Sequence, residues 1–345
     1  SATAPWVPAS AGTTTGAAGD ASGSASGSAS GSAPAAATGN GDTGRSGRKL
    51  ALCVGIDAYP GRDRLSGCVR DASQWQEVLQ GIGFTVTTLT DGQATRQAIE
   101  AGLGRLIDEA RPGDTVIFQY AGHGTEVPDV NGDETGGNNG RKDEALCPVD
   151  YVDGHLFIDD DIGAILDRAR PGVSITCFMD CCHSGTISRV ALGEPPEPAG
   201  QSRRARYLVL PPEAIARHRS FREQLTVGSR KLDLRRRNAM PEVVFSACRD
   251  IEVAWETNGQ GAFTCRAAPL LARAVAERWS NVAFFEQVKA AFGTEPSQHP
   301  ILDCAPPARA MSILGAAVVG QSGPGVAIPA EVPFGSSHPP AAWSQ

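Results

Sequence analysis

The sequence predicts an α/β fold in which a mostly parallel β-sheet is covered by helices on both faces. From residue 49 onward, apolar strand-like runs alternate with amphipathic helical segments, and such alternation is typical of parallel strands joined by crossover helices. The strand-like runs are apolar along most of their length, as expected for strands buried on both faces. Several of them end in polar turns that contain glycine. In parallel sheets, chemistry lies at the carboxyl ends of the strands.

The elements follow one another in a regular order. The first strand is the apolar run KLALCVGIDAY, and the second, FTVTTLT, is rich in β-branched residues. Five such runs predict strands, at residues 49–59, 84–90, 114–124, 173–185 and 243–250. Two segments with apolar residues at helical spacing predict helices, at residues 68–80 and 94–110.

The length of 345 residues suits one folded domain with poorly ordered ends. Residues 1–47 are dominated by Ala, Gly, Ser and Thr, so they cannot offset their ordering entropy and we expect them to be disordered. Residues 316–345 form a Pro- and Gly-rich tail. The folded domain is therefore expected at 48–315, with a long basic insertion at 186–241 that shows no strand or helix pattern.

Charge and composition exclude several classes of protein. A net charge of −7 argues against a general binder of nucleic acid or of anionic membranes, whose surfaces need a basic surplus. No apolar run reaches the roughly 18 residues of a membrane span, and no secretory signal is recognisable. The nine cysteines are an odd number without C-x-x-C pairs, which favours reduced thiols in the cytoplasm.

Two of the glycine-containing strand ends carry a histidine and a cysteine, His123 in YAGHG and Cys182 in DCCHSG. A thiol attacks only as the thiolate, so a nucleophilic Cys182 needs a base, and His123 is suited to that role. The backbone N–H groups of Gly124 and Cys182 are the candidate oxyanion hole. A structural histidine and a buried structural cysteine remain the alternative, and His183 is a second candidate base, although a neighbour in sequence usually points away.

At these residues a family resemblance appears. GIDAYPGRDRLSGCVRDA, YAGHG, KDEALCPVD, IDDDI, DCCHSG and VVFSACRDIEVAWE occur in the order seen in metacaspases and the bacterial orthocaspases, over about residues 48–310. The resemblance implies a caspase-like α/β fold, a His123 and Cys182 dyad, and peptide hydrolysis through an acyl-enzyme without a cofactor for the chemistry. It selects Cys182 over Cys181, favours a monomer, and suggests a role in programmed cell death or stress. The Q-A-C signature of true caspases is missing.

The charge near the nucleophile indicates the substrate. Asp180 precedes Cys182 by two residues, and Cys68 and Asp71 lie on the first turn of the helix that starts near 68. Two carboxylates beside the scissile bond favour arginine or lysine at P1, the residue before that bond, as metacaspases do. Asp71 could instead be a helix N-terminal charge. The family commonly has Ser where this chain has Ala121, so one pocket hydrogen bond is expected to be lost.

Acidic residues also suggest calcium, which prefers oxygen ligands and activates many metacaspases. By the family's motifs the ligands would be Asp143, Asp159 and Asp160. The fourth family position holds Arg189, a cation that opposes metal binding. The alternative is an acidic solvated loop, with Asp159 capping a helix that starts near Asp161.

The basic insertion follows the nucleophile and contains QSRRARY, ARHRSFR, GSRK and LRRRN. An arginine-specific enzyme could cleave itself there, whereas a solvated loop or a patch for an acidic partner is the alternative. Farther along, Trp255 and Phe263 are expected in the core or in a pocket wall.

These observations predict an endopeptidase that cleaves proteins or peptides after Arg or Lys. A catalytically silent scaffold or adaptor with the same fold is the first alternative, although such a protein has no chemical need for both His123 and Cys182. A thiol redox protein that uses Cys181 and Cys182 is the second, and a disulfide between adjacent cysteines is strained.

Overall fold

A six-stranded sheet forms the centre of the fold, with the strand order β11-β9-β7-β3-β1-β2. The computed structural model describes residues 47–128, 142–182, 203–225, 242–249, 252–294 and 297–315, so the expectations for 1–46 and 316–345 lie outside it. The sheet consists of β1 (Lys49–Gly55), β2 (Thr85–Thr90), β3 (Thr115–Ala121), β7 (Ser174–Asp180), β9 (Glu242–Ser246) and β11 (Ile301–Asp303). Its strands are parallel except β11, which is antiparallel to β9.

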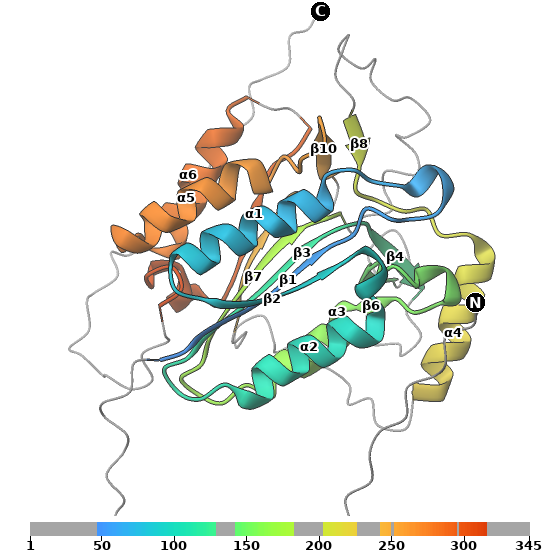
Figure 1. Cartoon of the computed structure of the whole chain (residues 1–345), viewed down its shortest axis with the longest axis horizontal. Coiled ribbons are helices and arrows are strands. Elements are labelled where there is room, and N and C mark those ends of the chain that lie inside the picture. Colours follow the sequence, from blue (N-terminus) through green and yellow to red (C-terminus); the bar gives the residue numbers. More distant parts are fainter. Residues whose placement is uncertain are drawn as a thin grey trace, which may run out of the picture. The chain divides into compact units, whose positions relative to one another are not determined.

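Helices cover both faces of this sheet (Figure 1). One face carries α1 (Cys68–Gly81), α5 (Thr264–Ala276) and α6 (Asn281–Phe292), and the other carries α2 (Arg96–Glu109) and α3 (Asp159–Leu166). Successive side chains of strand β1 point to opposite faces of the sheet. Leu52 and Val54 pack in the hydrophobic cluster that contains the α2 side chains, whereas Ala51 and Cys53 pack in the cluster beneath α1. The predicted doubly covered parallel sheet is confirmed.

The five predicted strands and helix α2 are confirmed with shorter bounds, and helix α1 is confirmed with one further residue, Gly81, at its end. Helix α2 begins at Arg96 because the Thr95 hydroxyl accepts a hydrogen bond from the Ala98 amide at 3.2 Å and so caps the helix. Its buried residues Ile99, Leu103 and Ile107 show the expected helical spacing. Short 3₁₀ helices lie at Gly61–Asp63, Asp91–Gln93, Tyr151–Asp153 and Pro306–Ala310.

Two small antiparallel sheets, strand β11 and three helices were not predicted; the helices are α5, α6 and one inside the basic insertion. One sheet joins β4 (Gly124–Pro128), β5 (Lys142–Leu146) and β6 (Phe157–Ile158), and the other pairs β8 (Arg203–Ala205) with β10 (Trp255–Thr257). Strand β8 and helix α4 (Pro212–Leu225) lie inside the basic insertion, so the expectation of a structureless insertion is wrong for residues 203–225.

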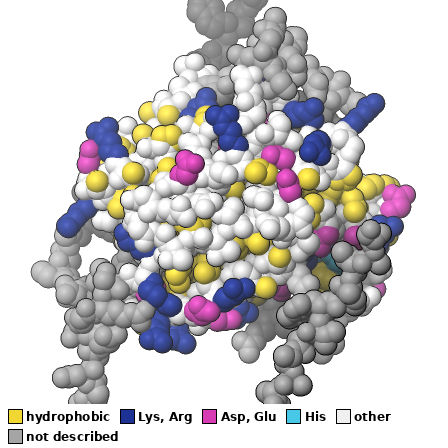
Figure 2. Space-filling model, in the orientation of Figure 1, with side chains coloured by type: hydrophobic (Ala, Val, Ile, Leu, Met, Phe, Trp, Pro, Cys, Tyr) yellow, Lys and Arg dark blue, Asp and Glu magenta, His cyan; other side chains and the backbone are white. Residues whose placement is uncertain are grey.

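The described surface and thiols agree with the composition. Acidic and basic side chains are interspersed over the face that Figure 2 shows. All nine cysteines are free thiols. Among the described helices, none has the length and the apolar character that crossing a membrane requires.

Candidate active site

His123 and Cys182 follow two neighbouring strands of the central sheet. Strands β3 and β7 are parallel, and their last paired residues are Ala121 and Asp180. His123 and Cys182 each come two residues after this pair, at the carboxyl edge of the sheet. The register of the two strands therefore brings the predicted base and nucleophile to the same end of the fold.

The surroundings of His123 determine which ring nitrogen carries its proton. The side chain is buried, and its Nε2 lies 2.7 Å from the carbonyl oxygen of Asp63. A carbonyl only accepts hydrogen bonds, so Nε2 carries the hydrogen and Nδ1 carries the lone pair. This Nδ1 is buried and has no hydrogen-bond partner among the described residues. Burial lowers the pKa of His123 to about 4, so the ring is a neutral base.

Cys182 lies in the turn after β7, and its thiol is enclosed by other groups. Its Sγ accepts a hydrogen bond from the Ala254 amide and lies 3.3 Å from the Sγ of Cys248. A hydrogen bond to Cys182, together with burial, raises the pKa of Cys248 well above its usual value, so Cys248 is a neutral thiol. Cys181 packs into the cluster on the α2 side of the sheet, whereas Cys182 packs on the α1 side.

The two predicted oxyanion-hole amides meet at one carbonyl oxygen. The amide of Gly124 donates to the carbonyl oxygen of Arg206 at 3.1 Å, and the amide of Cys182 donates to the same oxygen at 3.2 Å. Two convergent N–H donors on one peptide carbonyl are the arrangement that stabilises the oxyanion of a tetrahedral intermediate. The peptide bond between Arg206 and Tyr207 therefore lies against the candidate catalytic residues.

The side chain of Arg206 is fully buried among three carboxylates. Its guanidinium is paired with Asp71, lies 3.1 Å from Asp180 and lies 3.7 Å from Glu256. Burial alone would lower the pKa of Arg206, but the neighbouring carboxylates, with Asp180 foremost, raise it well above its usual value, so the guanidinium stays charged. Burial raises the pKa of Asp71 to about 7, although Arg206 opposes this shift. The pocket therefore binds a cation at the predicted carboxylates.

Helix α5 and the turn before it hold the pocket in place. Thr264, the first residue of α5, donates to Asp180 Oδ2 from its amide at 2.9 Å and from its hydroxyl at 2.7 Å. The amide of Gly261 donates to Asp71 Oδ2 at 3.0 Å. A Cβ on Gly261 would lie 2.3 Å from Asp180 Oδ2 and 2.4 Å from the Arg206 guanidinium, so only glycine leaves room for the bound side chain.

The backbone around Arg206 crosses the site in an extended form. Strand β8 pairs with β10 in antiparallel register, and the Arg206 amide donates to the Ala254 carbonyl at 2.9 Å. Beyond the Arg206 carbonyl, the Leu208 amide donates to the Gly124 carbonyl at 2.9 Å. The Thr125 hydroxyl donates to the Leu208 carbonyl at 2.8 Å. Backbone hydrogen bonds of this kind on both sides of a scissile bond are how peptides bind by strand addition.

The two other predicted pocket residues, Cys68 and Ala121, are not described partners of the Arg206 guanidinium. Cys68 is the buried first residue of α1, and the charge of Arg206 acts on its thiol, so it borders the pocket. Ala121 ends β3 inside the apolar cluster on the α2 side, and its carbonyl accepts the Ile56 amide. The guanidinium of Arg206 has its described partners elsewhere, in the carboxylates and in the backbone carbonyl of Asp180 at 3.2 Å.

Sequence reasoning did not identify several residues of the site, among them Asp63, Arg206, Cys248, Glu256 and Gly261. Glu256 ends the motif VVFSACRDIEVAWE, which could have drawn attention to it. Arg206 is one of many arginines in the insertion, and no local signal distinguishes it. His183, the second candidate base, and Arg189 lie outside the described residues.

One group of potential metal ligands occurs among the described residues, formed by Asp57, Cys68 and Glu256 with ligand atoms within 4.8 Å of one another. The Asp57 carboxylate accepts the amides of Cys68 and Val69, and the Glu256 carboxylate accepts those of Ser66 and Gly67. Burial raises the pKa of the Cys68 thiol, which therefore remains protonated. This donor set suits the N-terminus of α1 rather than a cation.

The three predicted calcium ligands lie on two neighbouring elements. Asp143 is buried in β5, while Asp159 and Asp160 open helix α3. The pairing of β5 with β6 ends at Ala145 and Ile158, and α3 begins at the next residue. The helix starts at Asp159 itself with Ile158 as its N-cap, so the alternative in which Asp159 caps a helix from Asp161 is wrong.

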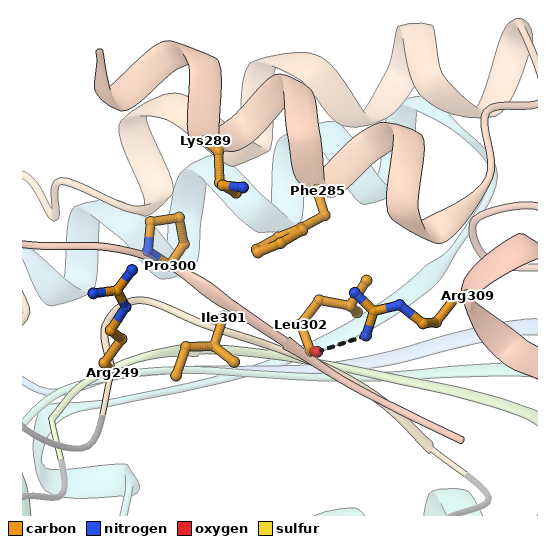
Figure 3. Close-up of a pocket in the computed structure, with 7 residues that line it drawn as sticks. All are labelled: Arg249, Phe285, Lys289, Pro300, Ile301, Leu302 and Arg309. Atoms are coloured by element: carbon orange, nitrogen blue, oxygen red, sulfur yellow. Dashed lines mark hydrogen bonds between the residues drawn. The ribbon is translucent and has the colours of Figure 1, made fainter. Parts of the chain in front are cut away.

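An open hollow elsewhere on the fold lies between α6 and β11 (Figure 3). Arg249, Lys289 and Arg309 line it together with apolar side chains such as Phe285 and Ile301. The lining contains no thiol, histidine or carboxylate, so it lacks the groups that peptide chemistry requires.

Part of the chain is similar to known peptidases. Residues 49–191 match the family described as metacaspase, peptidase C14 domain. Metacaspase-1 of Meyerozyma guilliermondii is 38% identical over 152 residues, Metacaspase-1 of Cryptococcus neoformans 36%, and Metacaspase-1A of Aspergillus fumigatus 34%. These alignments cover 41% of this chain and 36%, 32% and 36% of the relatives, so the chain spans about a third of their length.

A solved structure extends the likeness to the fold. The crystal structure of protein GSU0716 from Geobacter sulfurreducens superposes with a TM-score of 0.62 and 24% identity, covering 78% of this chain and 99% of that one. The sheet order and its helical layers define a caspase-like α/β domain. Residues 49–191 of this chain are similar to the metacaspase family of C14 peptidases.

Proposed function

We propose that the protein is a cysteine endopeptidase that hydrolyses peptide bonds after arginine or lysine. The observation that carries the proposal is the double donation to the Arg206 carbonyl, from the Gly124 and Cys182 amides, with the guanidinium in the carboxylate pocket. Arginine is preferred to lysine because its planar fork pairs with two carboxylates at once.

The mechanism uses groups of this chain alone. As the Cys182 sulfur attacks the scissile carbonyl carbon, its proton passes to Nδ1 of His123, and the oxyanion lies between the two amides. His123 then gives that proton to the leaving amine, the C–N bond breaks, and an acyl-enzyme remains. A water molecule gives a proton to His123 and attacks the thioester. The acid product leaves as Cys182 recovers its proton.

The first substrate is the chain itself. The bond between Arg206 and Tyr207 is already held by the oxyanion-hole amides, the carboxylate pocket and backbone hydrogen bonds on both sides. Such positioning replaces an encounter with a separate substrate. The position of this bond supports a processing role for the basic insertion, in preference to a purely solvated loop.

Mass spectrometry and N-terminal sequencing of the purified full chain test both proposals. Wild-type protein should yield a fragment that begins at Tyr207, and the Cys182→Ala and His123→Ala proteins should stay whole. Cys181→Ala is the matched control, because that thiol packs on the other side of the sheet, and it should still be cut. Equal fragments from Cys182→Ala would indicate a contaminating protease, and loss of cleavage only in Cys181→Ala would identify the other thiol as the nucleophile.

Peptides with different P1 residues test the specificity and the main rival. Efficient hydrolysis is expected after arginine, less after lysine and none after aspartate, because a fourth carboxylate would be buried without a partner. A silent scaffold or adaptor would hydrolyse none of them and would leave its own chain intact. A thiol redox protein would instead form a disulfide between Cys181 and Cys182 that mass spectrometry detects.

A calcium-dependent activation is a separate proposal, with Asp143, Asp159 and Asp160 as the ligands. The contact of helix α3 with strand β5 supports it, and carboxylate oxygens suit this ion. Calorimetric titration of calcium into the Cys182→Ala protein should show binding that Asp143→Asn weakens. Absence of binding at millimolar calcium, with peptide hydrolysis insensitive to chelator, would remove this proposal.

We also propose that the enzyme acts as a monomer in a reducing, cytoplasm-like compartment on protein or peptide substrates, without nucleic acid or membrane. The nine free thiols, with the nucleophile 3.3 Å from a second thiol, support the reducing setting. Light scattering on the Cys182→Ala protein should give the mass of one chain.

A further inference from the structure

The segment that lies across the active site has a defined position for each of its residues. In the antiparallel pairing of β8 with β10, Ala205 faces Trp255 and Arg203 faces Thr257. With Arg206 as the residue before the scissile bond, Ala205 occupies P2, Arg204 occupies P3 and Arg203 occupies P4. The inference below rests on the proposed peptidase function.

The P4 side chain has a built contact surface. The guanidinium carbon of Arg203 lies 4.2 Å above the centre of the Trp255 ring, and its Nη2 donates to the Ser297 hydroxyl at 2.5 Å. Guanidinium groups stack favourably on the electron-rich face of indole. The Trp255 backbone amide donates in turn to the buried Gln298 side chain at 3.2 Å, and this bond holds the strand that carries the ring.

The surroundings of the P3 side chain, Arg204, differ from those of the P4 side chain. Arg204 is exposed, and its described contact is one hydrogen bond to the backbone carbonyl of Arg64 at 2.8 Å. A single exposed hydrogen bond to a carbonyl discriminates little between side chains. Two neighbouring arginines of the same segment therefore receive different surroundings, and only Arg203 meets a side-chain surface suited to a cation.

We propose that Trp255 and Ser297 form a second cation-binding subsite, so that the enzyme selects extended protein segments with arginine at both P4 and P1. Trp255 is the specificity-determining residue of this subsite, because it supplies the ring face on which the P4 guanidinium lies. In the P1 pocket carboxylates pair with the cation, and the described part of the P4 subsite supplies an aromatic face and a hydroxyl.

Four fluorogenic peptides with the purified wild-type full chain test the proposal. The reference sequence is Arg-Arg-Ala-Arg, and the variants place alanine at P4, citrulline at P4 or alanine at P3. Citrulline is the matched control, since it keeps the shape of arginine without its charge. The kcat/KM should fall about fivefold to thirtyfold for either P4 change, the range that a partly desolvated cation over an indole ring gives. The P3 change should alter it less than about threefold.

Variants then assign the effect to the subsite. Trp255→Leu, which keeps an apolar side chain, should bring the ratio of kcat/KM between the P4-arginine and the P4-alanine peptide down to about one. Ser297→Ala should reduce the preference in part. A thermal melt of each variant identifies any loss of folding, in which case the wild-type peptide series alone decides.

The possible results distinguish a failure of the P4 subsite from a failure of the proposed peptidase function. Hydrolysis of all four peptides at similar rates overturns the P4 subsite and leaves the proposed peptidase intact. An equal P4 preference in folded Trp255→Leu overturns the role of Trp255. If no arginine peptide is hydrolysed and the chain stays whole, the peptidase proposal fails and the subsite fails with it.

Discussion

At the scale of single residues, Gly261 decides what fits beside the two pocket carboxylates. A methyl group there would meet Asp180, Asp71 and the Arg206 guanidinium at 2.3 to 2.6 Å, and all three contacts are with side chains. The missing side chain of this glycine thus leaves the room that the Arg206 guanidinium occupies.

We therefore expect Gly261→Ala to lower kcat/KM for arginine peptides about tenfold to a hundredfold, as overpacking of about 1 to 3 kcal/mol implies. The melting temperature should fall as well, since the methyl group also meets the Asp180 and Asp71 carboxylates, which belong to the pocket itself. Gly81→Ala is the matched control, because nothing lies within 4 Å of the added methyl group. Equal rates in wild type and Gly261→Ala would contradict the pocket geometry.

The raised pKa of Asp71 predicts how self-cleavage depends on pH. Burial raises this pKa to about 7, so above pH 7 the carboxylate is charged and binds Arg206, and below pH 7 it becomes neutral. His123 has its pKa lowered to about 4 and stays a neutral base throughout this range. The self-cleavage rate should therefore rise between pH 6 and pH 8 with a midpoint near the Asp71 pKa.

Asp71→Asn identifies the titrating group. Loss of a charged contact to a buried partner typically costs about 2 to 5 kcal/mol, so self-cleavage should slow by more than about thirtyfold. The slope near pH 7 should also disappear. A slow variant that keeps the wild-type midpoint would show that another group titrates.

At the scale of elements, the parallel strands could be predicted because each is a run of apolar residues, and this signal is visible in the local sequence alone. The alternation of Leu52 and Val54 with Ala51 and Cys53 between the two faces could be read locally. The strand ends followed from this order, and with them the positions of His123, Cys182 and Asp180.

The missed elements depend on partners distant in sequence. Strand β8 has only three residues, two of them arginines, and it forms because Ala205 pairs with Trp255 far along the chain. No local period can predict such a pairing. The position of Arg206 in the pocket and the contribution of Glu256 to it were not predicted, because both depend on the pairing of β8 with β10.

Strand β9 determines what happens to the fragments. Cleavage after Arg206 leaves β7 on one fragment and β9 on the other, and these strands pair along Ile175–Met179 and Glu242–Ser246 inside the central sheet. The cleaved protein should therefore elute in size exclusion at the volume of the intact chain and separate only in denaturant. Two fragments that elute apart without denaturant would contradict the burial of this strand pair.

At the scale of the whole molecule, the sheet separates two hydrophobic cores, and one of them reaches the active site. Phe178 lies in β7 between Trp75 and Phe245, with ring centres 4.3 and 5.3 Å away. The indole N–H of Trp75 donates to the Thr264 hydroxyl at 3.2 Å, and that hydroxyl holds Asp180. Core packing and pocket geometry are thus joined through three side chains.

Phe178→Ala should lower the free energy of unfolding by about 3 to 5 kcal/mol, because it removes a fully buried ring. Urea unfolding should be measured in the Cys182→Ala background, so that self-cleavage does not intervene. Val209→Ala, at a side chain that is 67% exposed, should stay within about 0.5 kcal/mol of its parent. A similar loss for both variants would contradict the core assignment.

The placement of Arg206 also has a consequence for the timing of activation. A bond held in the active site of its own molecule should break in a unimolecular step. The rate of self-cleavage is then independent of protein concentration, because no encounter with a second copy is needed. The half-life of the intact chain should then be the same at nanomolar and micromolar protein, and mixing with processed enzyme should not shorten it. Each molecule would therefore be activated independently of the others, and the rate would not accelerate as processed enzyme accumulates.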